Sequence, residues 1–308
     1  MTFRGALVAL VCICAGCGGA KAVKPQKVAG EPGYWVRVHG HRMYYECTGS
    51  GSPTIVLEAG LGGDHRNWVA VGPGLARVTR TCAYDRAGLG FSAAAGPSRT
   101  GREEVADLQT LLADAHIPPP YVLVGHSYGG LLVHEFASAH RRDVAGLVLV
   151  DSSHPRQAQR FLAALGPPRT GENPVRGQLR AFLRSEPPND EHLDLKSSFA
   201  EAASAGRLDD LPLIVITAGR ENDPRLGLNL KRLLDRTWLS LQSELARLST
   251  NSIHVIANLS HHDVISFAGQ PELVVEAVRA VLEAARTHGR LPRCRTLFRG
   301  SAATCVSG

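Results

Sequence analysis

Residues 122–130 constrain the fold of this chain most, because they place a serine between glycines where an apolar strand meets a helix. The segment reads Val-Leu-Val-Gly-His-Ser-Tyr-Gly-Gly, and Ser127 is the centre of a Gly-x-Ser-x-Gly pattern. Residues 122–124 predict a buried strand and residues 131–138 have helical spacing, so the chain must turn sharply at the serine. A Cβ at either flanking glycine would collide across that turn. The pattern predicts an exposed nucleophile beside helix amides that can bind an anion, whereas an incidental serine in a glycine-rich turn is the alternative.

Short apolar runs recur along the chain and alternate with segments of helical spacing. Unbroken apolar runs are typical of strands in a parallel sheet whose two faces are both covered by helices. The expected strands are 34–38, 42–47, 54–58, 81–84, 121–124, 147–150, 213–217 and 252–256. Because the first two form a hairpin, the sequence predicts an α/β fold with a mostly parallel, eight-stranded sheet. Ligands bind at the C-terminal ends of the strands in such sheets.

The first 20 residues are typical of a secretory signal, with Arg4, then an apolar run too short to span a bilayer, then small residues. The segment Cys14-Ala-Gly-Cys17 resembles a bacterial lipobox, in which the last cysteine is lipidated, although the motif prefers leucine where Cys14 stands. We expect an exported protein of the cell envelope, attached to the membrane only through a lipid on Cys17. Simple cleavage near Ala20 or Ala22 is the alternative.

Residues 21–33 carry three lysines, two prolines and two glycines, which predict an extended tether. We expect one large α/β domain at 34–290 with an inserted lid at 152–211, followed by a C-terminal tail at 291–308. The formal net charge of +6 is spread over many arginines with no basic run rich in aromatics. A nucleic-acid partner is therefore not expected.

Four cysteines lie beyond the leader, and four allow three pairings. Cys294 and Cys305 flank a short polar tail that has little other means of staying ordered, so we expect a disulfide between them. Cys47 and Cys82 lie in early strands, where a second disulfide and two small buried thiols are both compatible with the sequence. Neither pair has CxxC spacing, so no zinc site is expected.

Glycine-rich segments follow two of the expected strands. The amides of residues 58–63 can approach an oxyanion closely, because few side chains intervene. We predict that the amides of Leu61 and Tyr128 form an oxyanion hole, with a flexible connector as the alternative for the loop. The second segment, which begins with Asp85 and Arg86, predicts a structural turn whose aspartate binds that arginine or backbone amides.

The order and spacing of these segments resemble the α/β-hydrolase fold superfamily, AB hydrolase-1 type. The resemblance extends over residues 35–285 and implies a serine hydrolase that acts on a small acyl substrate without a cofactor. Relatives with haloalkane dehalogenase or epoxide hydrolase activity carry an aspartate nucleophile, so Ser127 disfavours those two chemistries. The matching segments are LEAGLGG at 57–63, YDRAGLGFS at 84–92, VGHSYGG at 124–130, LVLVDSSHP at 147–155 and the histidine near 262.

Between the strands at 147–150 and 213–217 the chain becomes polar and proline-rich, with helical segments near 156–165, 175–184 and 193–205. In the superfamily such an insertion forms a lid over the active site, where specificity would reside. Several apolar side chains in it could either line an acyl pocket or pack the lid on the core: Phe161, Leu162, Leu165, Leu179, Phe182 and Phe199.

The general base must follow the last strand, and the loop at 258–264 offers His261 and His262. The sequence His262-Asp-Val resembles the family pattern His-(Asp/Tyr/Phe)-(Ile/Val), so we predict His262 as the base and keep His261 as the alternative. His126 and His154 are near other site elements in the sequence and are candidates for substrate contact.

Two aspartates could orient this histidine. The commonest superfamily pattern places an aspartate three residues past a glycine after the strand at 213–217, but Asn222 occupies that position and Asp223 lies one residue late. Asp151 ends the preceding strand, where some haloalkane dehalogenase relatives carry their acid. Asp151 and Asp223 both keep the chain order serine, acid, histidine. We favour Asp151, keep Asp223 as the alternative and Glu221 as a further candidate.

These residues predict acyl transfer. His262 would take the proton from Ser127, Ser127 would attack an ester-like carbonyl, and water would then release the acyl-enzyme. Thioester or amide hydrolysis, acyl transfer and perhydrolysis on the same scaffold remain alternatives, since a fold does not fix a reaction. A non-catalytic surface binding protein and an anchored interaction protein of the envelope are the alternatives from other classes.

Overall fold

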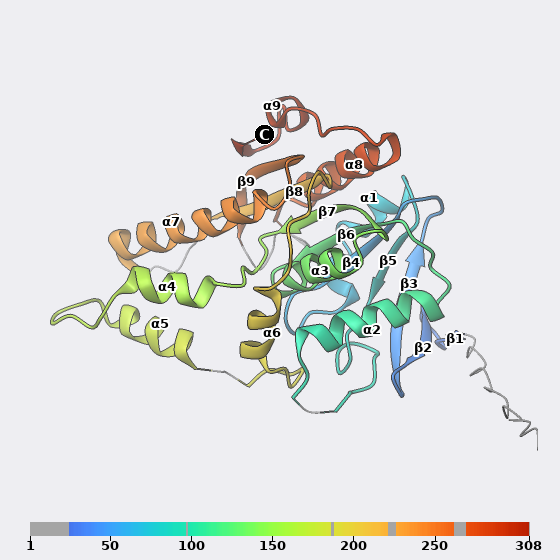
Figure 1. The fold of residues 1–308 in the computed structure, drawn as a ribbon, viewed down its shortest axis with the longest axis horizontal. Coiled ribbons are helices and arrows are strands. Elements are labelled where there is room, and N and C mark those ends of the chain that lie inside the picture. The colour runs from blue at the N-terminus through green and yellow to red at the C-terminus, as the bar shows by residue number, and fades with distance from the viewer. Residues whose placement is uncertain (1–24, 97, 186–187, 221–225, 262–268, 308) are drawn as a thin grey trace, which may run out of the picture.

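The computed structural model describes residues 25–307 except 97, 186–187, 221–225 and 262–268. Within these ranges one ten-stranded sheet has the order β1-β2-β3-β5-β4-β6-β7-β8-β9-β10 (Figure 1). The six strands β5, β4, β6, β7, β8 and β9 are parallel, and antiparallel strands flank them on both sides. The strands are β1 Gln26–Lys27, β2 Tyr34–Val38, β3 His41–Thr48, β4 Thr54–Glu58, β5 Thr81–Tyr84, β6 Tyr121–His126, β7 Val144–Val150, β8 Leu213–Arg220, β9 Ser252–His261 and β10 Ala303–Ser307.

Helices cover both faces of this sheet, as expected for strands that are apolar on both sides. On one face α2 and α3 bury side chains such as Leu108 and Phe136, and on the other α1 and α8 bury Leu75 and Val278. The α/β fold with a mostly parallel sheet is confirmed. The helices are the 3₁₀ helix η1 His65–Trp68, α1 Gly72–Ala76, α2 Gly101–Asp114, α3 Tyr128–Ala139, α4 Gln157–Leu165, α5 Pro174–Arg184, α6 Leu195–Ala202, α7 Gly227–Ala246, α8 Pro271–Thr287 and α9 Cys294–Leu297. None of the helices in the described ranges is both long and apolar enough to cross a bilayer.

The described residues form two strands more than the eight expected, and both lie at the edges of the sheet. β1 has only two residues, which is too short for any apolar pattern. β10 lies within the segment expected to be a tail, and it pairs antiparallel with β9 at the sheet edge. Its five residues are at least partly exposed and form no apolar run, so no periodicity predicts this strand.

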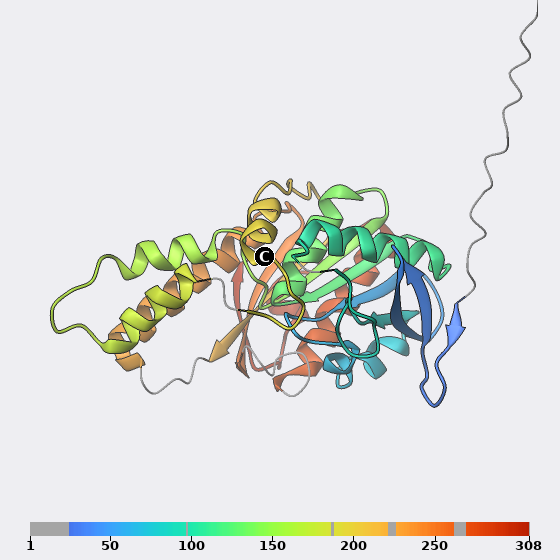
Figure 2. The ribbon, with the colours of Figure 1, turned by 90° about the horizontal axis from the view of Figure 1, so that it is seen from below.

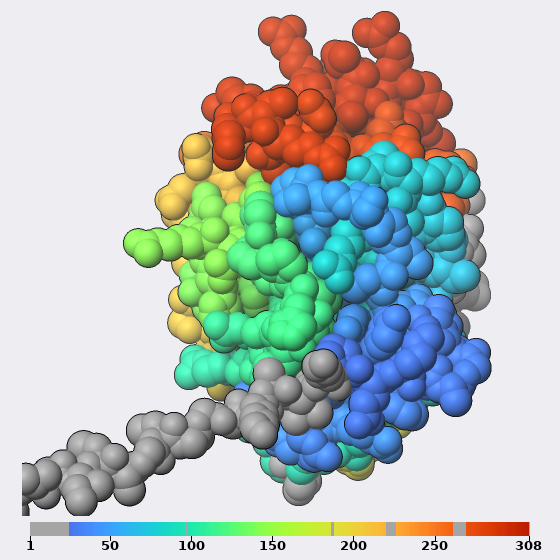
Figure 3. Space-filling view, turned by 90° about the vertical axis from the view of Figure 1, so that its right-hand side faces the viewer, coloured from blue at the N-terminus to red at the C-terminus, as the bar shows by residue number. Residues whose placement is uncertain are grey.

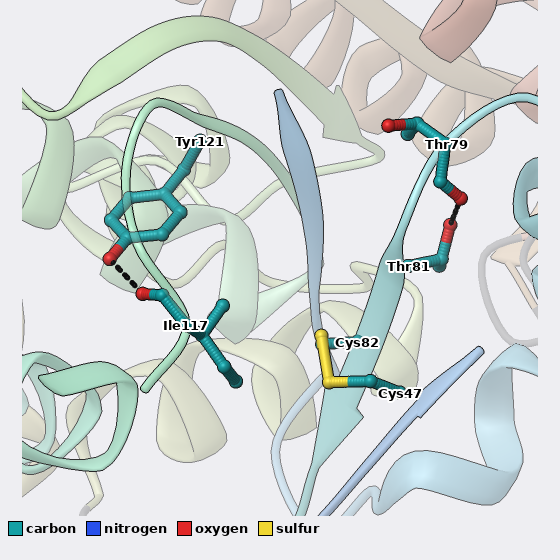
Figure 4. The surroundings of a disulfide bond; sticks show 6 residues. All are labelled: Cys47, Thr79, Thr81, Cys82, Ile117 and Tyr121. Atoms are coloured by element: carbon teal, nitrogen blue, oxygen red, sulfur yellow. Dashed lines mark hydrogen bonds between the residues drawn. A yellow bond between two sulfur atoms is a disulfide. The ribbon is translucent and has the colours of Figure 1, made fainter. Parts of the chain in front are cut away.

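Both pairs of cysteines beyond the leader form disulfides. The predicted bond between Cys294 and Cys305 joins α9 to β10 and is confirmed. Cys47 and Cys82, for which the sequence left two alternatives, stand directly opposite each other on β3 and β5 and are bonded (Figure 4). This second disulfide fastens the antiparallel hairpin to the parallel part of the sheet.

The segment expected to form a lid contains α4, α5 and α6 close to the predicted positions. α4 and α5 project from the sheet together with part of α7 and form an arm at one end of the molecule (Figures 1 and 2). The arm has a small apolar core of its own, centred on Leu165, Leu226 and Leu230. The hairpin of β2 and β3 lies at the opposite end, which faces the viewer in Figure 3. α6 packs instead on α2 and α3, over the sheet.

Candidate active site

Ser127 occupies a strained turn between β6 and α3. Its φ of +52° and ψ of −122° lie in a backbone region that residues other than glycine rarely adopt. The turn is held from the neighbouring strand, because the Ser127 amide donates to the Val150 carbonyl at 3.1 Å. A Cβ on Gly125 would lie 2.5 Å from the Gly129 carbonyl oxygen, so the chain can close this tightly only with glycine. The predicted sharp turn from strand to helix is present at Ser127.

The loop after β4 lies directly beside this serine. It forms a tight turn in which the Gly63 amide donates to the Gly60 carbonyl at 3.0 Å. A Cβ on Gly60 would come within 3.3 Å of the Ser127 Cβ, so the absence of a side chain lets the loop approach the nucleophile. Leu61 is within this turn, and Tyr128 is the first residue of α3, where backbone amides have no partner within the helix. The two predicted oxyanion donors therefore belong to segments that flank Ser127.

Asp151 follows β7 and is almost fully buried, with 2% of its surface exposed. Its Oδ1 accepts a hydrogen bond from the Ala218 amide at 3.0 Å and another from the Trp238 Nε1 at 2.8 Å. β7 is the strand next to β6, so Asp151 emerges one strand away from Ser127. Two competing candidates, Asp223 and Glu221, lie outside the described residues.

The predicted base His262 also lies outside the described residues. The alternative, His261, ends β9, whose C-terminal end is on the same side of the parallel sheet as Ser127, and its side chain is not described. His126 and His154 are buried, and neither lines the cavity beside the serine, so the structure does not support the expectation that they contact substrate. Burial lowers the pKa of His154 to about 4. This histidine accepts a hydrogen bond from the Arg156 amide and has a structural role.

A cavity of about 460 Å³ opens beside Ser127 and Asp151. α4, α5 and α7 supply its outer wall, which is mainly apolar: Phe161, Leu179, Phe182, Leu183, Leu234 and Trp238. Three of these, Phe161, Leu179 and Phe182, were among the six predicted pocket residues. A larger hollow of about 690 Å³ between α1 and α8 is lined by charged side chains such as Arg77 and Glu272, and Ser127 is not among its lining residues.

The other three predicted pocket residues do not line this cavity. Leu165 is fully buried in the core of the arm, and Leu162 is half-buried on the same helix. Phe199 packs against the main core, with its ring 6.5 Å from that of Tyr128. These residues pack the lid, which was the alternative for apolar side chains at helical spacing.

Trp238 is a site residue that the sequence did not predict. Its indole donates to Asp151, stacks on Phe161 with ring centroids 6.2 Å apart, and lines the cavity. The one available signal was a tryptophan on the buried stripe of a long helical segment, because a buried indole N–H needs an acceptor. That signal does not identify the acceptor, which is 87 residues away in the chain.

One cluster in the described ranges brings three metal-ligating groups together, namely Asp64, His65 and Asp85. Protein contacts already occupy these groups. Asp85 accepts from the amides of His65 and Phe91, each at 2.8 Å, and from the His65 ring at 2.7 Å. The prediction that Asp85 fixes backbone amides is thus confirmed, while Arg86 turns to other partners.

The order of the strands, the strained serine after β6 and the glycine turn after β4 define an α/β-hydrolase-fold protein. Residues 53–190 match the alpha/beta hydrolase fold family, in agreement with the resemblance seen in the sequence. A thermophilic esterase from Thermogutta terrifontis has the same fold, with a TM-score of 0.57 and 21% identity, over 82% of this chain and 98% of that one.

Two relatives show how far sequence similarity extends. The chain is 28% identical over 217 residues to the uncharacterized protein YqjL of Bacillus subtilis, over 70% of this chain and 79% of that protein. It is 41% identical over 114 residues to the putative carbamate hydrolase RutD of Yersinia enterocolitica, over 36% of this chain and 41% of that protein. The chain has the α/β-hydrolase fold, and its substrate has to be inferred from its own site.

Proposed function

We propose that this protein is a serine hydrolase that cleaves a carboxylic ester, or a related acyl bond, of a small molecule. The observation that carries the proposal is the strained Ser127 at the base of an apolar cavity, with the glycine turn of residues 60–63 against it. A strained backbone persists only where the surrounding structure enforces it, and such strain is common at catalytic nucleophiles.

In the proposed reaction the Ser127 hydroxyl attacks the substrate carbonyl and gives its proton to His262. The amides of Leu61 and Tyr128 stabilise the oxyanion, and Asp151 orients the histidine and stabilises its charged form. The histidine then protonates the leaving alcohol. Water attacks the acyl-enzyme, returns a proton through the same histidine and releases the carboxylic acid.

The cavity supports an apolar acyl group as the substrate part bound beside Ser127. Its volume of about 460 Å³ is within the range of roughly 300–1,000 Å³ that is common for small-molecule sites. The lining side chains Phe161, Leu179 and Trp238 offer aromatic and aliphatic surface, with Asp235 as a charged group among the lining residues. An acyl chain would bury its methylenes there, each stabilised by about 0.8 kcal/mol.

A carbamate or amide bond is the second candidate, because the putative carbamate hydrolase RutD is 41% identical over the matched residues. Both reactions use the same nucleophile and oxyanion hole, so the geometry alone favours neither. A panel of ester, carbamate and amide substrates with the same apolar acyl group would distinguish them.

The test of the proposed function combines covalent labelling with turnover. The parent protein should react with a fluorophosphonate and hydrolyse p-nitrophenyl esters, with kcat/KM rising with acyl length until the cavity is full. Ser127→Ala should lose the label and about 10⁶-fold of its turnover, the scale seen when a triad serine is removed. Labelling that persists in Ser127→Ala would contradict the assignment.

We also propose that the protein is exported and held at the membrane by a lipid on Cys17, which lies outside the described residues. The two disulfides support export, because disulfides persist in oxidising compartments. Cys17→Ser should release the protein from the membrane fraction and remove the lipid mass from its N-terminus. Unchanged fractionation and mass would rule out the anchor.

A further inference from the structure

Four charged side chains from four distant segments meet in the interior beside the active site. They are Glu58 at the end of β4, Arg86 after β5, Glu104 on α2 and Glu191 on the segment that returns from the lid. No more than 3% of any of these side chains is exposed. Burying charges has a large desolvation cost, so such a cluster is weak evidence for stability and suggests a functional role.

Arg86 is at the centre of this cluster and binds Glu191 through two hydrogen bonds. Its Nε donates to Glu191 Oε2 at 2.6 Å, and its Nη2 donates to Glu191 Oε1 at 2.8 Å. A paired contact of this kind fixes the plane of the guanidinium as well as its position. Nη1 donates to Glu58 at 2.6 Å.

The same guanidinium holds the glycine turn. Nη1 also donates to the Ala59 carbonyl at 2.6 Å, and Nη2 donates to the Gly60 carbonyl at 2.7 Å. The Gly60 carbonyl and the Leu61 amide belong to one planar peptide group and point in opposite directions when that group is trans. By binding this carbonyl, Arg86 fixes the direction in which the Leu61 N–H points.

Glu191 holds the next peptide group of the turn. Its Oε1 accepts a hydrogen bond from the Gly62 amide at 2.8 Å. The peptide groups on both sides of the Leu61 Cα are therefore fixed, one by Arg86 and the other by Glu191. A loop with so many glycines has little intrinsic preference for one conformation, so these bonds decide its shape.

The second oxyanion donor belongs to the same cluster through its side chain. The Tyr128 hydroxyl donates to Glu104 Oε2 at 3.0 Å, and the Arg86 guanidinium lies 5.6 Å from the centre of the Tyr128 ring. Glu104 Oε1 is 3.5 Å from Arg86 Nε. Burial raises the pKa of the Glu104 carboxyl well above its usual range.

We propose that Arg86 and Glu191 are positioning residues that aim the Leu61 amide at the oxyanion and keep it in register with the Tyr128 amide. This inference rests on the proposed function. It gives the lid segment a second role, because Glu191, which lies between α5 and α6, binds the glycine turn. Without that contact Ser127 would keep its position, while the Leu61 N–H would no longer be held toward the oxyanion.

Glu191→Gln tests this inference. Glutamine keeps the size of the side chain, but its amide nitrogen must face either an Arg86 N–H or the Gly62 N–H, donor against donor. Removal of an oxyanion donor lowers kcat by about 10²–10³-fold. We expect a misdirected donor to lower kcat by about 10–100-fold while KM changes less than about threefold. The affinity for a trifluoromethyl ketone, which forms a tetrahedral oxyanion on the serine, should fall by the same factor as kcat.

Glu172→Gln is the matched control. Glu172 pairs with Arg180 in the arm, the arginine is equally buried, and neither residue lines the cavity or contacts the glycine turn. The control should keep kcat and inhibitor affinity within about twofold of the parent. If Glu191→Gln behaves like Glu172→Gln while the parent labels and turns over, the positioning role is wrong and the proposed function stands.

A readout without catalysis separates the two ideas further. Hydrogen exchange of the Gly62 amide should be faster in Glu191→Gln than in the parent and unchanged in Glu172→Gln. A parent that neither labels nor turns over would overturn the proposed function, and the positioning role with it. If Glu191→Gln does not fold, Tyr128→Phe removes the hydroxyl that contacts Glu104 and Ser198 and leaves the Tyr128 amide in place. This variant should still lower kcat by about 3–10-fold, whereas an unchanged kcat would overturn the role of the cluster.

Discussion

Replacing Asp151 by asparagine should abolish most of the activity and leave the fold intact. Both described hydrogen bonds to this side chain end on Oδ1, one from the Ala218 amide and one from the Trp238 indole. The carbonyl oxygen of asparagine can accept both. The amide nitrogen then takes the place of the second carboxylate oxygen and presents a donor where the predicted triad needs an acceptor.

The expected magnitudes separate a catalytic role from a structural one. Loss of the carboxylate from a triad holds the histidine in the wrong tautomer and lowers kcat by about 10⁴-fold, or about 5.4 kcal/mol of transition-state stabilisation. The folded state keeps both hydrogen bonds and loses only the charge that strengthens them. A decrease of about 1–3 kcal/mol in the free energy of unfolding is therefore expected.

The assay is steady-state turnover of an activated p-nitrophenyl ester, with thermal melting to show that each variant is folded. Asp235→Asn is the matched control, because Asp235 lines the same cavity but is largely exposed and paired with Lys231. Asp223→Asn tests the competing acid. The choice of Asp151 is wrong if kcat of Asp151→Asn stays within about tenfold of the parent, an effect of about 1.4 kcal/mol, while Asp223→Asn loses nearly all turnover.

Three further outcomes are expected. Trp238→Phe removes one charge-assisted hydrogen bond to Asp151 and should lower kcat by about tenfold with fluorophosphonate labelling retained. An unchanged kcat would show that this hydrogen bond does not support catalysis. Burial lowers the pKa of His254 to about 4, so the neutral imidazole stabilises the folded state fully above pH 6.5. As the pH falls toward 4, the free energy of unfolding should decrease by up to about 3 kcal/mol. Urea titrations should show this loss in the parent and not in His254→Asn. Replacing Cys294 and Cys305 by serine should lower the free energy of unfolding by up to about 3 kcal/mol, and an unchanged value would mean that the disulfide does not stabilise the tail.

The sheet and the sharp turn at Ser127 were predictable because their signals are local. Most of the central strands contain a short apolar run, and every expected strand is present, although β8 and β9 continue past their expected ends to Arg220 and His261. The elbow was predictable because a tight strand-to-helix turn can be built from few residue types, so the glycines around Ser127 identify it.

The contacts that complete the site could not be predicted, because they join residues that are distant in the chain. Trp238 meets Asp151 only because α7 runs from the arm to the sheet, and Glu191 meets Arg86 across 105 residues. Periodicity describes which face of an element is buried, and it does not say which partner meets a buried polar group. The strand β10 was missed for another reason, since an edge strand of five partly exposed residues carries no apolar pattern.

The position of β1 has a consequence for how the molecule would meet a membrane. β1 lies at the end of the molecule opposite to the arm formed by α4, α5 and α7 (Figures 1 and 2). If Cys17 carries a lipid, the residues between it and β1 span at most about 30 Å, so the β1 end would stay near the bilayer. The arm, and with it the outer wall of the cavity, would then face away from the lipid headgroups. Such an orientation favours substrates that arrive dissolved in water over lipids withdrawn from the anchoring membrane.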